Sequence, residues 1–196
     1  MSTDRQHYRR DVPGFGVVTI RPVRPDDDAD LLHGWVTTDR ARFWGMRDAS
    51  RERVREIYAY LDSLTTHHAY LVHRDGVPAA LAQTYEPGAD PVGDCYEVRP
   101  GDVGVHLLIG PPLSAEPGFT GALFGTILNF VFADPGRLRV VMEPDVRNDR
   151  MLRRLRRSGF RAGPVIELPE KQARLHFLDR PERVGLADGR AHDDAG

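Results

Sequence analysis

The stretch of residues 102–112 constrains the fold of this chain more than any other. Its β-branched and leucine side chains predict a buried strand, and a Gly-Pro-Pro sequence ends that strand. Because side chains alternate along a strand, Gly104, His106 and Leu108 share one face and the intervening apolar residues share the other. An imidazole beside a glycine in mid-strand is typical of a site that a ligand or another segment approaches closely. A hydrogen-bonded core histidine is the equal alternative.

Length and composition predict one α/β domain with a substantial core, since the chain has 196 residues, of which 40% are hydrophobic and 29% charged. The net charge of −2 gives no general attraction for nucleic acid or an anionic membrane. A single cysteine, Cys95, excludes a disulfide framework and a cysteine-based metal site. No metal is expected, because the eight histidines show no metal-ligand spacing. No targeting or membrane-spanning run is present, so we expect a cytoplasmic protein that acts on small molecules.

Hydrophobic periodicity and turn residues predict a mixed α+β fold. Residues 14–179 form the expected domain, between a flexible arm at 1–13 and a disordered tail at 180–196. The predicted architecture is one mixed β-sheet of about seven strands, with a splayed central pair, flanked by about four helices. Strands are expected at 15–23, 69–74, 77–85, 95–99, 102–110, 137–142, 160–168 and 173–178, and helices at 26–35, 50–64, 120–133 and 148–158.

Several motifs stand together in the chain. A glycine-bearing loop leads into the helix at 120–133, and an asparagine opens a helix that ends in Gly-Phe. The motifs are Phe43-Trp-Gly-Met46, Asp102-x-Gly-x-His-Leu-Leu-Ile-Gly110, Glu143-Pro-Asp-x-x-Asn148, Gly159-Phe160 and Leu168-Pro-Glu-Lys-Gln-Ala173. With these motifs, residues 15–178 resemble the GNAT superfamily of CoA-dependent N-acyltransferases, and in particular its branch that makes siderophore hydroxamates.

The resemblance implies transfer of a short acyl group from acetyl-CoA or succinyl-CoA to an N-hydroxylated amine of the lysine, ornithine or cadaverine type. It assigns His106 as general base and Asp145 as the group that holds the amine. The implied CoA contacts are Leu107, Leu108 and Ile109 with pantetheine, Gly118, Phe119, Thr120 and Gly121 with the pyrophosphate, and Asn148 with the pantetheine arm. The implied amine contacts are Trp44, Gln83, Tyr85 and Lys171.

Several of these residues have an ordinary structural alternative. Asp145 could instead cap the helix that follows it. Trp44 could fill the core, and Lys171 could be a solvated surface lysine. A monomer and a homodimer are both compatible with the sequence.

The sequence also departs from the family pattern at three places. The phosphate loop matches only the first family glycine, at Gly118; Leu155 stands where many GNAT enzymes have a tyrosine that protonates the CoA thiolate; and Gln83 stands where the branch has an acid. Two competing functions therefore stay open: an aminoglycoside or other small-amine N-acetyltransferase, and a non-catalytic acyl-CoA-binding module.

Overall fold

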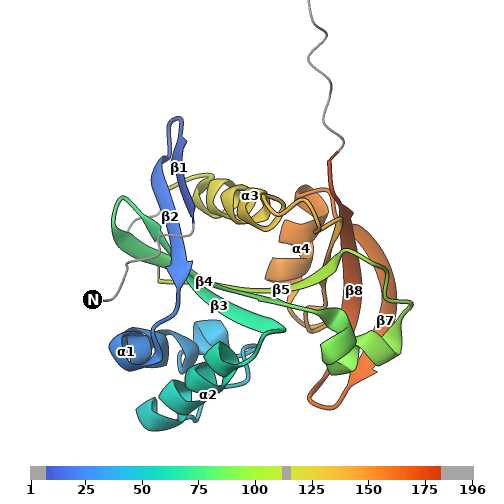
Figure 1. The fold of residues 1–196 in the computed structure, drawn as a ribbon, viewed down its shortest axis with the longest axis horizontal. Coiled ribbons are helices and arrows are strands. Elements are labelled where there is room, and N and C mark those ends of the chain that lie inside the picture. Colours follow the sequence, from blue (N-terminus) through green and yellow to red (C-terminus); the bar gives the residue numbers. More distant parts are fainter. Residues whose placement is uncertain (1–7, 112–115, 182–196) are drawn as a thin grey trace, which may run out of the picture.

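One mixed sheet organises the computed structural model, which describes residues 8–111 and 116–181 (Figure 1). Within these residues the sheet has eight strands in the order β1-β2-β3-β4-β5-β6-β8-β7. The strands are β1 (Tyr8–Val12), β2 (Gly16–Pro22), β3 (His67–Arg74), β4 (Val77–Tyr85), β5 (Asp102–Ile109), β6 (Arg139–Met142), β7 (Arg161–Leu168) and β8 (Lys171–Asp179). The helices are α1 (Pro25–Val36), α2 (Arg51–Ser63), α3 (Phe119–Val131) and α4 (Asp149–Arg157).

The helices cover both faces of the sheet, with α1 and α2 on one side and α3 and α4 on the other (Figure 1). On β5, Leu108 packs in the cluster that contains the buried residues of α1 and α2. Val105 and Leu107 pack in the opposite cluster, with the buried residues of α3. The alternation predicted from the sequence is therefore present, and it places His106 on the Leu108 side.

Local sequence signals start helix α2 and turn the β3–β4 hairpin. The Ser50 hydroxyl accepts a hydrogen bond from the backbone N–H of Arg53 (3.1 Å) and so caps α2. The β3–β4 hairpin turns through Asp75 and Gly76, which both have positive φ, at 49° and 81°.

The central strands β5 and β6 separate soon after they begin. They pair in parallel only from Asp102 to Gly104 on β5, whereas β4 follows β5 from Gly104 to Ile109. The edge of β5 beyond Gly104 thus has no ladder partner on the β6 side among the described residues. This is the splayed central pair that the sequence predicted, and its backbone groups are available to a ligand.

Two predicted elements differ from the structure. Tyr8–Val12, assigned to a flexible arm, forms the edge strand β1, and Tyr8 packs edge-on against Phe130 (centroids 5.6 Å apart). The strand predicted at 95–99 is absent; Pro91–Cys95 instead forms a 3₁₀ helix whose start is capped by the Asp90 carboxylate. The rest of the predicted arm (1–7) and the tail from 182 lie outside the described residues.

Candidate active site

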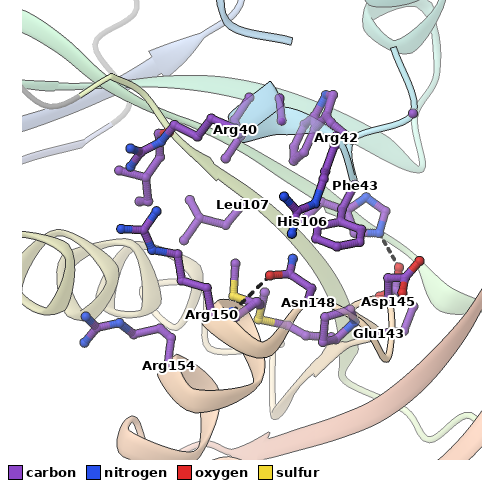
Figure 2. A pocket seen from close by; sticks show the side chains of 18 of the residues that line it. Arg40, Arg42, Phe43, His106, Leu107, Glu143, Asp145, Asn148, Arg150 and Arg154 are labelled. Carbon is purple, nitrogen blue, oxygen red and sulfur yellow. Dashed lines mark hydrogen bonds and ion pairs between the residues drawn. The ribbon is translucent and has the colours of Figure 1, made fainter. Parts of the chain in front are cut away.

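A cavity of about 640 Å³ lies where β5 and β6 separate (Figure 2). Its walls come from β5, the loop after α1, the end of β6, α4 and the β7–β8 turn. Side chains from both faces of β5 reach it, because the missing ladder partner leaves the strand open on that side. The cavity therefore connects the two sides of the sheet.

His106 projects into this cavity and is held at both ring nitrogens. Nε2 contacts Oε1 of Glu143, and Nδ1 lies 3.3 Å from Oε1 of Gln83. The indole of Trp44 packs edge-on against the imidazole, with centroids 6.3 Å apart. About a third of the His106 side chain (35%) is exposed, so a ligand in the cavity can reach the ring. This arrangement suits a general base or acid.

Glu143, directly after β6, is the carboxylate that reaches His106 (Figure 2). Its side chain is only 3% exposed, yet both oxygens have partners: Tyr85 donates its hydroxyl to Oε2 (2.9 Å) and Lys171 donates to Oε1 (3.3 Å). Burial alone would raise the pKa of Glu143, but the charge and hydrogen bond of His106, with Lys171 and Tyr85, lower it to about 2. Glu143 is therefore an ionised carboxylate in the core.

Asp145 also lines the cavity, but its carboxylate is engaged elsewhere. The Arg147 guanidinium donates to both oxygens (2.9 and 2.6 Å), and the Arg147 backbone N–H donates to Oδ1 (2.8 Å). These hydrogen bonds hold the pKa of Asp145 below its ordinary value. The splay thus brings the two predicted catalytic residues to one cavity, although the carboxylate in contact with His106 belongs to Glu143.

The predicted amine contacts divide into two groups. Trp44, Gln83 and Lys171 line the cavity, and Trp44 donates its indole N–H to the hydroxyl of Tyr58 (3.2 Å). Tyr85 does not line it among the described residues; burial raises its pKa, and it lies behind Glu143. The substrate contact predicted for Tyr85 is therefore not seen.

Gly104 explains why Tyr85 can lie there. A Cβ atom on Gly104 would fall 2.1 Å from Cζ of Tyr85, so only glycine leaves room for the phenol ring on this face of β5. The sequence predicted a close approach at this glycine, and the approaching group is a ring of the protein itself.

The predicted CoA contacts are also mixed. Leu107, Leu108, Ile109, Thr120 and Asn148 line the cavity. Asn148 caps α4 as well, because its side-chain oxygen accepts from the backbone N–H of Met151 (3.2 Å). In the described part of the chain, Gly118, Phe119 and Gly121 lie off the cavity wall.

These three residues have local structural roles. Gly118 is the N-terminal flanking residue of α3 with φ of 82°, and Phe119 packs on the ring of Phe15 (centroids 5.3 Å apart). Gly121 faces Arg154, whose guanidinium would lie 3.1 Å from a Cβ at that position.

A group of cavity arginines was not predicted. They lie on the loop after α1 and on α4, and Figure 2 shows three of them, Arg40, Arg150 and Arg154, on the α3 side of the cavity. Arg40 donates Nε to the Ile109 carbonyl (3.2 Å), and burial with the nearby Arg150 charge lowers its pKa. The residues of this arginine group are Arg40, Arg42, Arg150, Arg153, Arg154 and Arg157. Several cations that line one cavity favour an anionic ligand.

The remaining observations concern features that the described residues lack. Leu155 is fully buried in the core, and no tyrosine is among the described residues that line the cavity. The described ranges contain no group of histidine, cysteine and carboxylate side chains that could hold a metal ion. Nor does any helix within 8–111 and 116–181 have the length and apolarity to cross a bilayer.

The chain matches a family model described as an acetyltransferase (GNAT) domain over residues 24–168. The protein belongs to the GNAT acetyltransferases. The fold class and the family predicted from the sequence motifs are thereby confirmed, and the matched region contains both β5 and α4.

Two curated relatives carry descriptions of acyltransferases. The chain is 29% identical over 183 residues to N(6)-hydroxylysine O-acetyltransferase of Escherichia coli. The aligned region covers 88% of this chain and 56% of that relative. The chain is 24% identical over 131 residues to lysine N-acyltransferase MbtK of Mycobacterium sp. (strain MCS), covering 66% and 53%. The GNAT chain thus spans about half the length of the curated relatives that it matches.

A solved structure shows the same fold at lower identity. The aminoglycoside acetyltransferase AAC(6')-Ib, in complex with coenzyme A and kanamycin, superposes with a TM-score of 0.72 at 22% identity, covering 83% of this chain and 95% of that one. At this identity the likeness establishes the GNAT fold alone.

Proposed function

We propose that this GNAT protein transfers a short acyl group from an acyl-CoA to an N-hydroxylated amine and so forms a hydroxamate for siderophore biosynthesis. The observation that carries the proposal is His106, partly exposed in the cavity where β5 leaves β6 and backed by the buried carboxylate of Glu143. The descriptions of the two curated relatives, one acting on N6-hydroxylysine and one on lysine, support the acceptor class.

The proposed chemistry needs only one proton acceptor. The electron-withdrawing oxygen makes an N-hydroxyamine less basic than its parent amine, so much of it is neutral near pH 7. Its nitrogen attacks the thioester carbonyl, the C–N bond forms, the C–S bond breaks, and the nitrogen proton passes to His106. Both Asp145 and Lys171 line the cavity, and the proposal gives them the task of orienting the acceptor.

The leaving thiolate has no tyrosine to protonate it among the described cavity residues. It departs as the thiolate, or receives through water the proton that His106 has just accepted. A solvent isotope effect that is unchanged when His106 is replaced by alanine would rule out the second route.

The arginine group offers a place for the phosphates of CoA. Arg40 contacts the Ile109 carbonyl at the end of the strand that is expected to pair with pantetheine, and Arg154 faces the first turn of α3. Glu116 is an acid in the loop before α3, and its negative charge would repel a phosphate. Its carboxylate is paired with Arg74, which offsets that charge. Arginine suits this task because its guanidinium forms two-pronged hydrogen bonds with phosphate.

An aminoglycoside acceptor fits the cavity less well. Such substrates are polycations, and a site for them needs carboxylates without a competing cation. Near His106, Glu143 is already paired with Lys171, and Asp145 with Arg147. The other carboxylates that line the described cavity are Asp39, paired with Arg47, and Glu170. Because six arginines line the same cavity, it favours an acceptor with little or no net positive charge over kanamycin-like compounds.

The test is product formation from acetyl-CoA and succinyl-CoA with N-hydroxylysine, N-hydroxyornithine and N-hydroxycadaverine. A hydroxamate chelates iron(III) and gives a coloured complex, whereas an O-acyl product does not. We expect a coloured product with at least one pair and none with the His106→Ala variant. Absence of hydroxamate from every pair would contradict the proposal. Binding of CoA with no rate above background would point to a non-catalytic module.

A further inference from the structure

The carboxylate in contact with His106 is buried at the wall of the cavity. Glu143 is 3% exposed and receives hydrogen bonds from Tyr85 and Lys171 in addition to its contact with His106. Asp145 instead holds Arg147, whose side chain is 75% exposed. A buried carboxylate fixed by Tyr85 and Lys171 is a firmer support for an imidazole than one paired with an exposed surface arginine.

From this geometry we propose that Glu143 is the positioning residue for His106: it holds the proton on Nε2 and so leaves Nδ1 as the nitrogen that accepts the proton of the acyl acceptor. This inference rests on the proposed function. It gives Glu143 a role that the sequence motifs did not assign, and it leaves Asp145 with the acceptor, as those motifs imply.

The hydrogen-bonding capacity of each group supports this tautomer. An ionised carboxylate can only accept, so the nitrogen in contact with Glu143 must carry a hydrogen. The Gln83 atom that lies 3.3 Å from Nδ1 is Oε1, which also only accepts, so a bare Nδ1 requires the Gln83 amide to be turned over. An amide can turn its NH₂ group toward a lone pair, and an incoming amine can displace it. Nδ1 is therefore the exchangeable side of the ring.

Lys171 balances the negative charge of Glu143, so the His106 imidazole can be neutral beside that carboxylate. Its ammonium lies 3.3 Å from the same oxygen that contacts His106, so the negative charge of Glu143 already has a cation. The other titratable groups that face Glu143 in the described chain are Tyr85 from β4 and Tyr96 from the loop before β5. Without Lys171, the protonated form of His106 would be the sole counter-charge.

Gly104, two residues before His106 on β5, also contributes to holding Glu143 in place. Because Gly104 has no side chain, the Tyr85 ring lies against β5, and its hydroxyl donates a hydrogen bond to Glu143. The spacing Gly-x-His on one strand face thus has a physical reason. Gly104 leaves room for the ring of Tyr85, and Tyr85 holds the Glu143 carboxylate. In the proposal, Glu143 in turn orients the imidazole two residues after the glycine.

The direct test is nitrogen-15 NMR of the histidine ring, with the His106 signals identified by their loss in the His106→Ala variant. At pH 8 we expect a protonated Nε2 and a bare Nδ1 in the wild type, and loss of this single tautomer in Glu143→Gln. A proton on Nδ1 with a bare Nε2 in the wild type would overturn the proposal, even if Glu143→Gln cannot be prepared folded.

Kinetics give an independent readout. In Glu143→Gln we expect kcat to fall by about 100-fold or more, with KM for the acyl-CoA nearly unchanged. The matched variant Asp145→Asn should keep kcat within about tenfold and raise KM for the amine. In Lys171→Met the acidic limb of the kcat/KM profile should move to higher pH. Wild-type kcat in folded Glu143→Gln would overturn the positioning role.

The two proposals can fail separately. The NMR measurement needs no substrate, so the expected tautomer with no hydroxamate product would contradict the acceptor class alone. Hydroxamate formation with the opposite tautomer would contradict the role of Glu143 alone.

Discussion

Replacement of Gly104 by alanine would place a methyl carbon against the ring of Tyr85. The added Cβ would lie 2.1, 2.3 and 2.4 Å from three ring carbons, well inside van der Waals contact. The ring has little room to move, because Tyr85 is 3% exposed and its hydroxyl is bound to Glu143. The backbone at Gly104 cannot shift away from the ring either, because it pairs with both β4 and β6.

Overpacking of this kind costs about 1 to 3 kcal/mol of unfolding free energy. For a chain of this length that corresponds to a fall in Tm of about 2 to 12 °C. Urea unfolding, followed by circular dichroism, measures the free energy directly. Because the shifted ring would also disturb Glu143, we expect a lower kcat in the same variant.

The matched control is Gly34→Ala on α1. Gly34 is exposed, and no atom lies within 4 Å of its added Cβ, so the same change should stabilise the helix by about 0.5 to 1 kcal/mol. A second control is a Tyr85→Leu background, in which the cost of Gly104→Ala should fall by about 1 kcal/mol or more. An equal cost with and without the aromatic ring, or none in the wild type, would refute the steric reasoning.

Three other predictions concern different parts of the molecule. Asp102→Ala should cost about 3 to 5 kcal/mol of stability in urea unfolding, because it strands the Arg139 guanidinium, to which Asp102 is bound through two 2.7 Å hydrogen bonds with both side chains at most 7% exposed; an unchanged midpoint would contradict this. Because the pKa of Glu143 is lowered from 4.5 to about 2, its stabilising contribution is complete above pH 4.5 and is lost as the pH falls toward 2. Urea unfolding between pH 5 and 3 should therefore show a weaker loss of stability on acidification in Glu143→Gln than in the wild type, and equal losses would refute it. Arg150→Ala should raise KM for acetyl-CoA by roughly threefold to tenfold with kcat retained, whereas Arg156→Ala, on the exposed side of α4 and off the cavity, should leave KM unchanged.

The sequence was sufficient for most of the fold because the main elements have strong local signals. The β3–β4 hairpin has its Asp-Gly turn, and α2 has its serine cap. The edge strand β1 has the sequence Tyr-Arg-Arg-Asp-Val, whose charged side chains are exposed and give no apolar alternation. Its strand conformation comes from pairing with β2, which periodicity cannot detect.

The candidate site was only partly predictable for a similar reason. His106 could be found because an imidazole interrupts an apolar strand. Glu143 stood in the Glu-Pro-Asp motif directly after a predicted strand, but its contact with His106 spans 37 residues of sequence and depends on where β6 lies beside β5. The arginines of α4 could not be assigned to the cavity from the sequence, because that assignment depends on where the helix packs. A buried neighbour at long sequence separation is therefore the kind of residue that only the structure reveals.

The most direct measurement is the ratio of kcat/KM for N-hydroxylysine to that for lysine, with acetyl-CoA and the same enzyme preparation, and with kanamycin as a third acceptor. A preference of about 100-fold or more for the hydroxylated amine, abolished in His106→Ala, is the expected result. Equal or better use of lysine or kanamycin would contradict hydroxamate formation and place the protein among the general amine acetyltransferases.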